Sequence, residues 1–359
     1  MSGFLSEKYG SLEPYTPGEQ PKNGINYVKL NTNESPYPPS PHAVSYASAA
    51  VSGTRLYCDP ECTELRRAAS CYYGVTADCI VCGNGSDDIL NFAFAAFCDD
   101  KTPAVFADIT YGFYRVFADY NRVPYKVIPL KDDLSLDVGD YENCGGTVFI
   151  ANPNAPTGMT VDIGSIERLL QKNKDNVVVI DEAYVDFGGE SCVPLTEKYK
   201  NLLVTQTFSK SRSLAGARLG FGIGDRALIA DCNTVRFSTN PYNVNSITQA
   251  AGIGALEDRQ YTEQNCEKIM ITREKTVKRL EKLGFICTDS HANFIFARHK
   301  TANGKTLYEK LKENGVLVRR FDQPRIRDHL RITVGDERQM DILIGKLEAV
   351  LTEVENEIR

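Results

Sequence analysis

The sequence has no run of about eighteen apolar residues, the length a helix needs to cross a membrane. Its first ten residues are mostly polar and lack the apolar core of a secretory signal, so we expect no exported precursor. What remains is a chain of 359 residues, which is long enough for one large core and a second, smaller one. We therefore expect a cytoplasmic enzyme rather than a membrane or secreted protein.

An excess of either charge is also missing. The 41 basic and 47 acidic residues give a net charge of −6 at pH 7. A chain with this balance has no extended basic surface for a polyanion, so we expect neither nucleic acid nor an anionic membrane as a partner. Small-molecule substrates fit the composition better.

Clustered metal ligands are absent from the sequence as well. Its four histidines are scattered along the chain. One Cys-x-x-Cys occurs at 79–82, but it lies in a predicted strand, and no second pair or nearby histidine completes a zinc site. Eleven cysteines are an odd number without framework spacing, which indicates free thiols in a reducing compartment. We predict no metal.

The pattern of apolar residues predicts an α/β protein with two domains. Residues 1–35 are rich in proline, glycine and asparagine and are predicted to form an N-terminal arm that packs with the small domain. From 36 to 255, helices alternate with continuously apolar runs, as in a mostly parallel central sheet that helices cover on both faces. Residues 256–359 repeat strand and helix and are predicted to form a smaller α/β domain.

Individual elements follow from the same pattern and from capping residues. Helices are predicted at 62–73, stopped by Gly74, and at 86–97, with Ser86 as N-cap. The stretch 244–282 has the composition of a long charged helix that links the two domains. Strands of the large domain are predicted at 80–82, 147–150, 177–180, 202–205 and 219–223. The tail is predicted as strand 293–297, helix 305–314, strands 316–318 and 330–333, and helix 338–354.

Polar clusters follow two of these strands, where the sites of open α/β sheets collect. Asp181 ends the run at 177–180, and a buried aspartate needs a partner, such as a protonated pyridine nitrogen, a helix N-terminus or a cation. Lys210 follows the run at 202–205. A single lysine is by default a surface residue, whereas a lysine of lowered pKa can condense with an aldehyde. Thr207 and Arg218 would then bind a phosphate.

Two loops add weaker signals. Residues 151–158, Ala-Asn-Pro-Asn-Ala-Pro-Thr-Gly, form a rigid turn that offers asparagine side chains. Residues 83–87, Gly-Asn-Gly-Ser-Asp, lie between a strand and a helix, and such a loop presents free N–H groups to an anion. This second loop is not a Walker loop, and it lacks the third glycine of the dinucleotide fingerprint.

Taken in order, these clusters resemble the fold-type I pyridoxal-phosphate enzymes of the aspartate aminotransferase superfamily. The resemblance rests on Asp-Glu-Ala-Tyr at 181–184, Thr-Phe-Ser-Lys at 207–210 and Arg218, and it spans nearly the whole chain. It implies pyridoxal 5′-phosphate as cofactor, with Lys210 as the Schiff-base lysine and proton shuttle. Asp181 would pair with the pyridinium nitrogen, and Tyr184 would bond to the phenolic oxygen of the cofactor.

The resemblance also implies how the cofactor and a partner subunit are held. Tyr111 would stack on the ring, and the phosphate would be bound by Gly85, Ser86, Asp87, Thr207, Ser209 and Arg218. Tyr57 matches a tyrosine that reaches the phosphate of the neighbouring subunit. This match implies an obligate homodimer with shared active sites.

Within the superfamily the chain resembles the histidinol-phosphate aminotransferases. That resemblance implies a ping-pong exchange of the amino group between histidinol phosphate and 2-oxoglutarate, giving imidazole acetol phosphate and glutamate. Tyr15, Asn33, Arg319 and Arg331 would bind the substrate. Arg319 and Arg320 face opposite ways in a strand, so only one can enter the pocket, and we favour Arg319.

The chain departs from the superfamily pattern at two positions. The usual Asn-Pro-Thr-Gly has its asparagine directly before the proline, where this chain has Ala155, so either Asn154 supplies the hydrogen bond to the phenolic oxygen or no residue does. Ile109 stands where a proline usually precedes the Thr-Tyr pair. Two other reactions stay open on the same motifs: transamination of aromatic or other amino acids, and decarboxylation of an amino-acid phosphate such as threonine phosphate.

Overall fold

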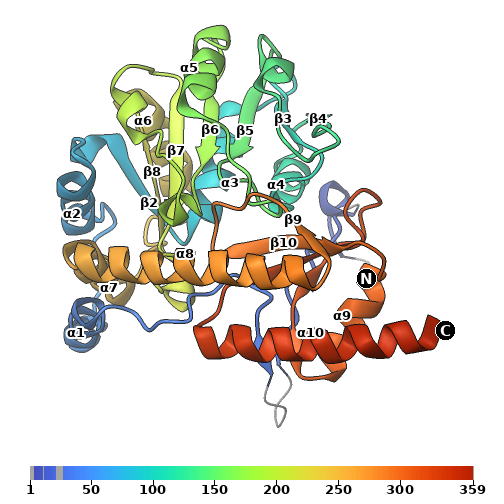
Figure 1. The fold of residues 1–359 in the computed structure, drawn as a ribbon. Helices are drawn as coiled ribbons and strands as arrows, with labels where there is room; N and C mark the ends of the chain where they lie inside the picture. Colours follow the sequence, from blue (N-terminus) through green and yellow to red (C-terminus); the bar gives the residue numbers. More distant parts are fainter. Residues whose placement is uncertain (1–3, 11, 22–26, 359) are drawn as a thin grey trace.

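A seven-stranded sheet forms the centre of the larger body (Figure 1). The computed structural model describes residues 4–10, 12–21 and 27–358; parts of the predicted arm, residues 1–3, 11 and 22–26, lie outside the described residues. The strand order is β2-β8-β7-β6-β5-β3-β4, and β8 alone runs antiparallel to its neighbours. The strands are β2 (Ile80–Gly83), β8 (Gly220–Gly224), β7 (Leu202–Thr207), β6 (Val178–Asp181), β5 (Thr147–Ala151), β3 (Ala104–Ala107) and β4 (Tyr125–Ile128).

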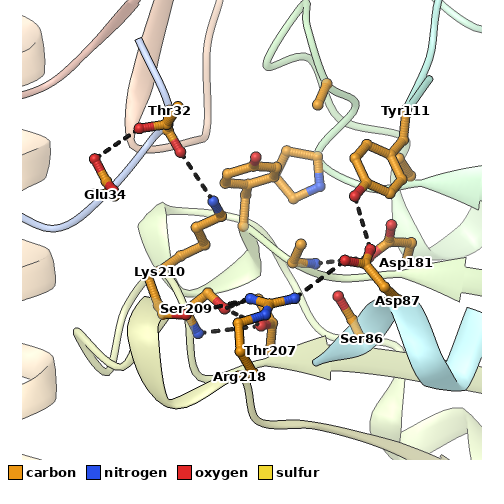
Figure 2. A pocket seen from close by; sticks show the side chains of 16 residues that line it. Thr32, Glu34, Ser86, Asp87, Tyr111, Asp181, Thr207, Ser209, Lys210 and Arg218 are labelled. Carbon is orange, nitrogen blue, oxygen red and sulfur yellow. Dashed lines mark hydrogen bonds and ion pairs between the residues drawn. The ribbon is translucent and has the colours of Figure 1, made fainter. Parts of the chain in front are cut away.

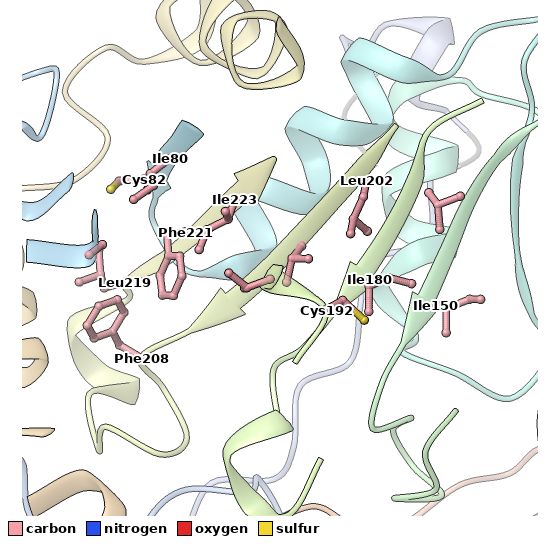
Figure 3. Packing of buried hydrophobic residues seen from close by; sticks show 14 of the residues in the cluster. Ile80, Cys82, Ile150, Ile180, Cys192, Leu202, Phe208, Leu219, Phe221 and Ile223 are labelled. Atoms are coloured by element: carbon pink, nitrogen blue, oxygen red, sulfur yellow. The ribbon is translucent and has the colours of Figure 1, made fainter. Parts of the chain in front are cut away.

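Helices cover both faces of this sheet, which explains why its central strands are apolar at every position. On one face, Val178 and Ile180 of β6 pack in a cluster with α1 (Pro41–Ala50), α2 (Thr63–Tyr73), α5 (Ile163–Lys172) and α7 (Ser246–Glu257) (Figure 3). On the other face, Val179 packs in a cluster with α3 (Ser86–Phe97), α4 (Phe113–Asn121) and α6 (Arg226–Thr239). Both clusters fix the ends of β6 and β7, where the site lies.

The smaller body is built on a four-stranded antiparallel sheet of order β12-β13-β10-β9. Its strands are β9 (Phe285–Cys287), β10 (Phe294–His299), β12 (Arg319–Arg320) and β13 (His329–Thr333). Near the start of the chain, β1 (Val28–Lys29) pairs in parallel with β11 (Val316–Leu317). The following residues, 30–34, therefore run from the smaller body towards the larger one.

Three helices complete the smaller body: α8 (Arg259–Lys282), α9 (Gly304–Glu313) and α10 (Glu337–Ile358). The long helix α8 crosses below the large sheet and reaches the smaller one (Figure 1). No helix in the described part of the chain is both long and apolar enough to span a membrane. Short 3-10 helices occupy Glu7–Tyr9, Val51–Gly53, Ala77–Cys79, Val138–Tyr141, Val185–Phe187, Val193–Glu197 and Ala215–Ala217.

The predicted strands and tail helices are present within a few residues of their predicted bounds. Two details were wrong. The N-cap of α3 is Gly85 and not Ser86, which is the first helical residue. The stretch 244–282 contains two helices instead of one, because the backbone leaves helical geometry at Asp258. The domain boundaries after residues 35 and 255 stay a prediction.

Candidate active site

A cavity of about 230 Å³ opens where the carboxyl ends of β6 and β7 meet the first turn of α3 (Figure 2). The sheet brings these segments together because parallel neighbours end at the same edge. Nine residues singled out from the sequence line it: Ser86, Asp87, Tyr111, Asp181, Tyr184, Thr207, Ser209, Lys210 and Arg218. Segments more than a hundred residues apart in sequence thus share one small volume.

Lys210 reaches into this cavity from the turn that follows β7. Its Nζ donates a hydrogen bond to the backbone oxygen of Thr32 (3.3 Å) and lies 5.7 Å from the ring centre of Tyr184. Among the described residues the amine forms no ion pair with a carboxylate. A lysine held by one carbonyl and an aromatic ring can exchange these contacts for a covalent bond to a small carbonyl compound.

The floor of the cavity is suited to a phosphate. Arg218 donates to Ser209 Oγ (3.2 Å) and to Asp87 Oδ2 (3.2 Å), and Thr207 donates to Ser209 Oγ (3.0 Å). The backbone N–H of Ser86 is the first of α3, so the positive end of the helix dipole faces the same place. A guanidinium, two hydroxyls and a helix N-terminus together are the donor set that a phosphate monoester requires.

Two glycines allow the floor to be this compact. A Cβ on Gly220 would lie 2.2 Å from the backbone nitrogen of Ser86, and a Cβ on Gly85 would lie 2.5 Å from Arg218 Nη2. Gly85 also has φ of +89°, a conformation that side chains disfavour. Any larger residue at either position would fill the space in front of the donors, so these glycines keep the phosphate cradle open.

Asp181 lies at the back of the cavity and is 4% exposed. It accepts hydrogen bonds from the Tyr114 hydroxyl (3.2 Å) and the backbone N–H of Ala183 (3.2 Å). Burial raises its pKa to about 7. A cationic ring nitrogen placed against this carboxyl would lower that pKa again and stabilise the charged pair, so the site fits the pyridinium of pyridoxal phosphate.

Two tyrosines line the walls. The Tyr111 hydroxyl donates to Asp87 Oδ1 (2.8 Å), and burial together with this carboxylate raises the pKa of Tyr111, which therefore stays a neutral phenol. The Tyr184 hydroxyl accepts a hydrogen bond from Asn33 Nδ2 (3.0 Å), so its own proton is free to be donated into the cavity. Asn33 is itself fixed by Thr333, which donates to its Oδ1 (3.1 Å).

Asn154 does not line the cavity, whereas its neighbour Ala155 does. The Asn154 carboxamide is engaged within its own loop region, where it accepts from Thr110 Oγ1 (2.9 Å) and donates to Ile109 O (3.0 Å) and Thr157 Oγ1 (3.1 Å). These hydrogen bonds stabilise the turn, and the carboxamide of Asn154 does not line the cavity.

A second cavity of about 310 Å³ adjoins the first and shares Thr32, Tyr111, Ala155, Tyr184 and Lys210 with it. Its other predicted residues are Tyr15, Asn33, Arg319 and Arg331. Both arginines contact only backbone oxygens and aromatic rings among the described residues. Burial lowers the pKa of Arg331, but an arginine keeps its charge. This cavity therefore suits an anionic substrate.

Two further residues named in the sequence analysis lie away from both cavities: Arg320, which we did not favour as the substrate arginine, and Tyr57. Arg320 bonds to Asp322 (2.6 Å) and to the backbone oxygen of Arg327 (2.8 Å), and it does not line the cleft. Tyr57 is 84% exposed and stacks on Tyr242, with ring centres 4.6 Å apart. Tyr57 takes no part in the site of its own subunit.

Sequence reasoning missed three residues of the site. Tyr114 lies in the first turn of α4 and bonds to Asp181, but Tyr111 precedes that helix, so no helical spacing in the sequence links the two tyrosines. Thr32 contributes a backbone oxygen, which no side-chain motif reveals. Phe321 lines the substrate cavity from the smaller body, two residues after Arg319.

Comparison with known proteins places this geometry in a family. Residues 25–347 match the family model described as Aminotransferase class I and II. The chain belongs to the class I and II aminotransferases. It is 47% identical, over 98% of its own length and 99% of the relative's, to the histidinol-phosphate aminotransferase of Brachyspira hyodysenteriae. It is 46% identical over the full length of both chains to the enzyme of the same name from Clostridium beijerinckii.

Solved structures of aminotransferases share the fold. Histidinol-phosphate aminotransferase from Sinorhizobium meliloti, solved in complex with pyridoxal-5′-phosphate, has a TM-score of 0.84 with 22% identity, and the match covers 92% of each chain. The predicted fold class, an α/β fold-type I aminotransferase with a mostly parallel central sheet, is thereby confirmed. The predicted resemblance to histidinol-phosphate aminotransferases is confirmed by the relatives above.

Proposed function

We propose that this protein is a pyridoxal-phosphate-dependent histidinol-phosphate aminotransferase. It moves the amino group of histidinol phosphate to 2-oxoglutarate and yields imidazole acetol phosphate and glutamate. One observation carries the proposal: Lys210, Asp181 and Arg218 converge on one cavity. This cavity adjoins a second one with two arginines that form no ion pair with a carboxylate in the described part of the chain. The full-length relatives of the same name support the choice of substrate.

The cofactor would supply an aldehyde and an electron-accepting ring when bound. Arg218, Ser209 and Thr207 would hold its phosphate, and Asp181 would keep the ring nitrogen protonated by charge pairing. Tyr184 would donate its hydroxyl proton to the phenolic oxygen of the ring, since Asn33 occupies its acceptor side. Because Ala155 replaces the usual asparagine, Tyr184 is the one side chain that we assign to this oxygen.

Lys210 would carry out the proton transfer. With the cofactor bound, the amine of Lys210 would be the group that takes a proton from the substrate Cα and holds it for the next step. Thr32 O and the Tyr184 ring hold the amine at the junction of the two cavities, between cofactor and substrate. The lysine is thus placed to act on both.

Substrate choice would depend on the two arginines. Arg331 would bind the carboxylate of glutamate and 2-oxoglutarate and, in the other half-reaction, the phosphate of histidinol phosphate, because a planar guanidinium pairs with either anion. Arg319 would add a second charged contact to the phosphate. A dianion gains more from two guanidinium groups than a monoanion does.

A panel of amino donors with 2-oxoglutarate as acceptor tests the proposal. We expect histidinol phosphate to give the highest kcat/KM, with aromatic amino acids well below it. Glutamate formation is measured directly, and carbon dioxide release is measured with threonine phosphate in parallel. A higher kcat/KM for an aromatic amino acid, or carbon dioxide release without amino transfer, would replace the proposal by one of those reactions.

We also propose that the enzyme works as a homodimer with shared active sites. Large apolar side chains are exposed on α1 and the residues that follow it, and near the end of α6. They are Val44, Tyr46, Val51, Leu56, Tyr57 and Tyr242. An apolar patch of this kind is typical of a protein interface, and Tyr57 within it would reach the phosphate site of the partner subunit.

Mixed dimers test the shared site. Tyr57→Ala and Lys210→Ala homodimers are each expected to be impaired, whereas one of the two sites in a mixed dimer has both wild-type side chains. We expect activity to rise when the two variants are unfolded and refolded together, relative to each refolded alone. If mixed dimers form, as shown by differently tagged chains, and activity does not rise, Tyr57 acts only within its own subunit or not at all.

The proposed location is the cytoplasm. All eleven cysteines are free thiols in the structure, and several of them are at least partly exposed. Free thiols persist in a reducing compartment and are oxidised outside it. Fractionation of cells that express the tagged protein would test this placement.

A further inference from the structure

Phe321 lies against both arginines of the substrate cleft. The guanidinium carbon of Arg331 is 5.5 Å from the ring centre of Phe321, and that of Arg319 is 5.8 Å from the same ring. Phe294 packs on Arg331 as well, also at 5.5 Å. Phe321 is thus the aromatic residue that both cations share.

The two arginines are direct cross-strand neighbours, since Arg319 of β12 is paired with Arg331 of β13. Like charges directly opposite each other in an antiparallel pair repel. Arg331 is half-buried. Among the described residues its Nε has no hydrogen-bond partner, and its Nη2 bonds only to the backbone oxygen of Asn31 (3.2 Å). Without a compensating contact the two side chains would separate whenever no anion is bound.

An aromatic ring provides such a contact. The negative face of a phenyl ring attracts a guanidinium, and the attraction grows where water is excluded. Phe321 follows Arg319 by two residues, so both side chains leave an extended backbone on the same side. The ring therefore attracts both guanidinium groups without neutralising them, and both remain available to an anion.

The ring is held in place by the larger body. Residues 321–328 form a loop whose Ile326 is 1% exposed and packs in a cluster with Ala107, Ile109 and Leu130. Arg325 in the same loop donates to three oxygens of the larger body: Asp108 Oδ2 (3.0 Å), Leu130 O (2.9 Å) and Lys131 O (2.6 Å). The loop that joins the two arginine-bearing strands, β12 and β13, is thus anchored on the larger body.

We propose that Phe321 is a specificity-determining residue that sets the spacing of Arg319 and Arg331 for a phosphate-bearing donor. The inference rests on the proposed function, because it assumes that the two arginines bind the substrate anion. Phe321 does not touch the reacting atoms. It acts by keeping two repelling guanidinium groups within reach of one dianion.

Steady-state kinetics of the holoenzyme with Phe321→Leu, Phe321→Tyr and the wild type test this role. For Phe321→Leu we expect about a tenfold rise in KM for histidinol phosphate, from the loss of two cation–ring contacts, and kcat within about twofold. Phe321→Tyr keeps the ring face and is expected to retain the wild-type KM. The inhibition constant of inorganic phosphate against histidinol phosphate should rise in parallel with KM for the leucine variant.

Several outcomes would overturn the inference: an unchanged KM and phosphate inhibition constant in Phe321→Leu, an equal loss in Phe321→Tyr, or a fall in kcat without a change in KM. Thermal unfolding of each variant separates loss of fold from loss of specificity, and Phe321→Met provides a second ring-free side chain if the leucine variant unfolds. If the wild type does not use histidinol phosphate, the proposed function fails. The inhibition constant of phosphate against the true donor then still decides the role of Phe321.

Discussion

The two adjoining cavities form a cofactor half and a substrate half of one cleft, and their charged side chains have different partners. In the cofactor half, Arg218 is paired with Asp87, and Asp181 accepts from Tyr114. In the substrate half, Arg319 and Arg331 form no ion pair with a carboxylate among the described residues and contact only carbonyl oxygens and rings. A cofactor that stays bound can be held by side chains that already form hydrogen bonds and ion pairs with one another. Substrates that bind and leave in turn need charged side chains that have no counter-ion while the site is empty.

The largest effect is expected from removing Lys210, whose side chain lines both the cofactor half and the substrate half. Lys210→Ala should lower turnover on the order of 10³-fold or more, because Lys210 is the one lysine among the described residues that line either cavity. Phosphate contacts remain, so the cofactor should still bind noncovalently. Borohydride treatment of the wild type should leave one cofactor mass on the Lys210 peptide, and a cofactor mass on another lysine would contradict this assignment.

The next largest effect is expected in the cofactor half. Asp181→Ala leaves the ring nitrogen without its counter-charge, and we expect turnover to fall on the order of 10²-fold or more, a loss of about 3 kcal/mol or more in transition-state stabilisation. Asp181→Glu, which keeps the charge, serves as the control. Near-normal turnover of the alanine variant in a pre-steady-state assay would show that the ring does not depend on this carboxylate.

The substrate half allows a comparison between its two arginines. Arg331→Ala should weaken both histidinol phosphate and glutamate, whereas Arg319→Ala should weaken histidinol phosphate more. A charge-assisted hydrogen bond contributes about 1.5–3 kcal/mol, which corresponds to roughly 10- to 100-fold in kcat/KM. Arg320→Ala, outside the cleft, is the matched control. Equal losses for both substrates in Arg319→Ala would remove the distinction that we draw between the two positions.

The smallest effect concerns stability rather than rate. Burial raises the pKa of Asp181 to about 7, so without cofactor the folded protein binds more protons than the unfolded chain between about pH 4 and pH 7. The free energy of unfolding therefore falls as pH rises through this window. Each pKa unit corresponds to about 1.4 kcal/mol, so this group contributes a loss of a few kcal/mol.

Urea unfolding of the cofactor-free wild type and Asp181→Asn at pH 5 and pH 8 measures this contribution. We expect a smaller loss between the two pH values in the variant. Glu182 is a useful neighbour for comparison, because burial raises its pKa to about 7 as well, but protein groups surround it. Glu182→Gln should reduce the loss with or without cofactor, whereas the effect of Asp181→Asn should shrink when cofactor is bound. Identical pH slopes in wild type and Asp181→Asn would contradict the raised pKa.

The sequence predicts most of the cofactor half and less of the substrate half. Asp181 and Lys210 each follow a continuously apolar strand, and the rule that parallel strands end at one edge is enough to bring them together. The strands at 104–107 and 125–128 were not identified; β4 is partly exposed and lacks the continuous apolar run of the buried strands. Tyr111, which follows β3, was still assigned to the site because the family resemblance names it without reference to that strand.

Contacts between distant residues were beyond sequence reasoning. The hydrogen bond from Asn33 to Tyr184 joins residues 151 positions apart in the sequence. The residues next to either one in the sequence do not predict this contact. The position of Phe321 depends on how the loop 321–328 docks on the larger body, which is decided by tertiary packing. The N-cap of α3 was misassigned for a local reason: Gly85, at φ of +89°, turns the chain one residue earlier than the serine rule predicts.

The pairing of β1 with β11 has a consequence for how the protein matures. Val28 lies beside Val316, so the segment that carries Thr32 and Asn33 into the site pairs with a strand that is synthesised much later than the segment itself. At about 5–20 residues per second, the early segment waits on the order of tens of seconds for its partner. The large sheet can form on the ribosome in the meantime, but the contact between Lys210 and the backbone oxygen of Thr32 gains its support from the smaller body only after β11 has paired with β1.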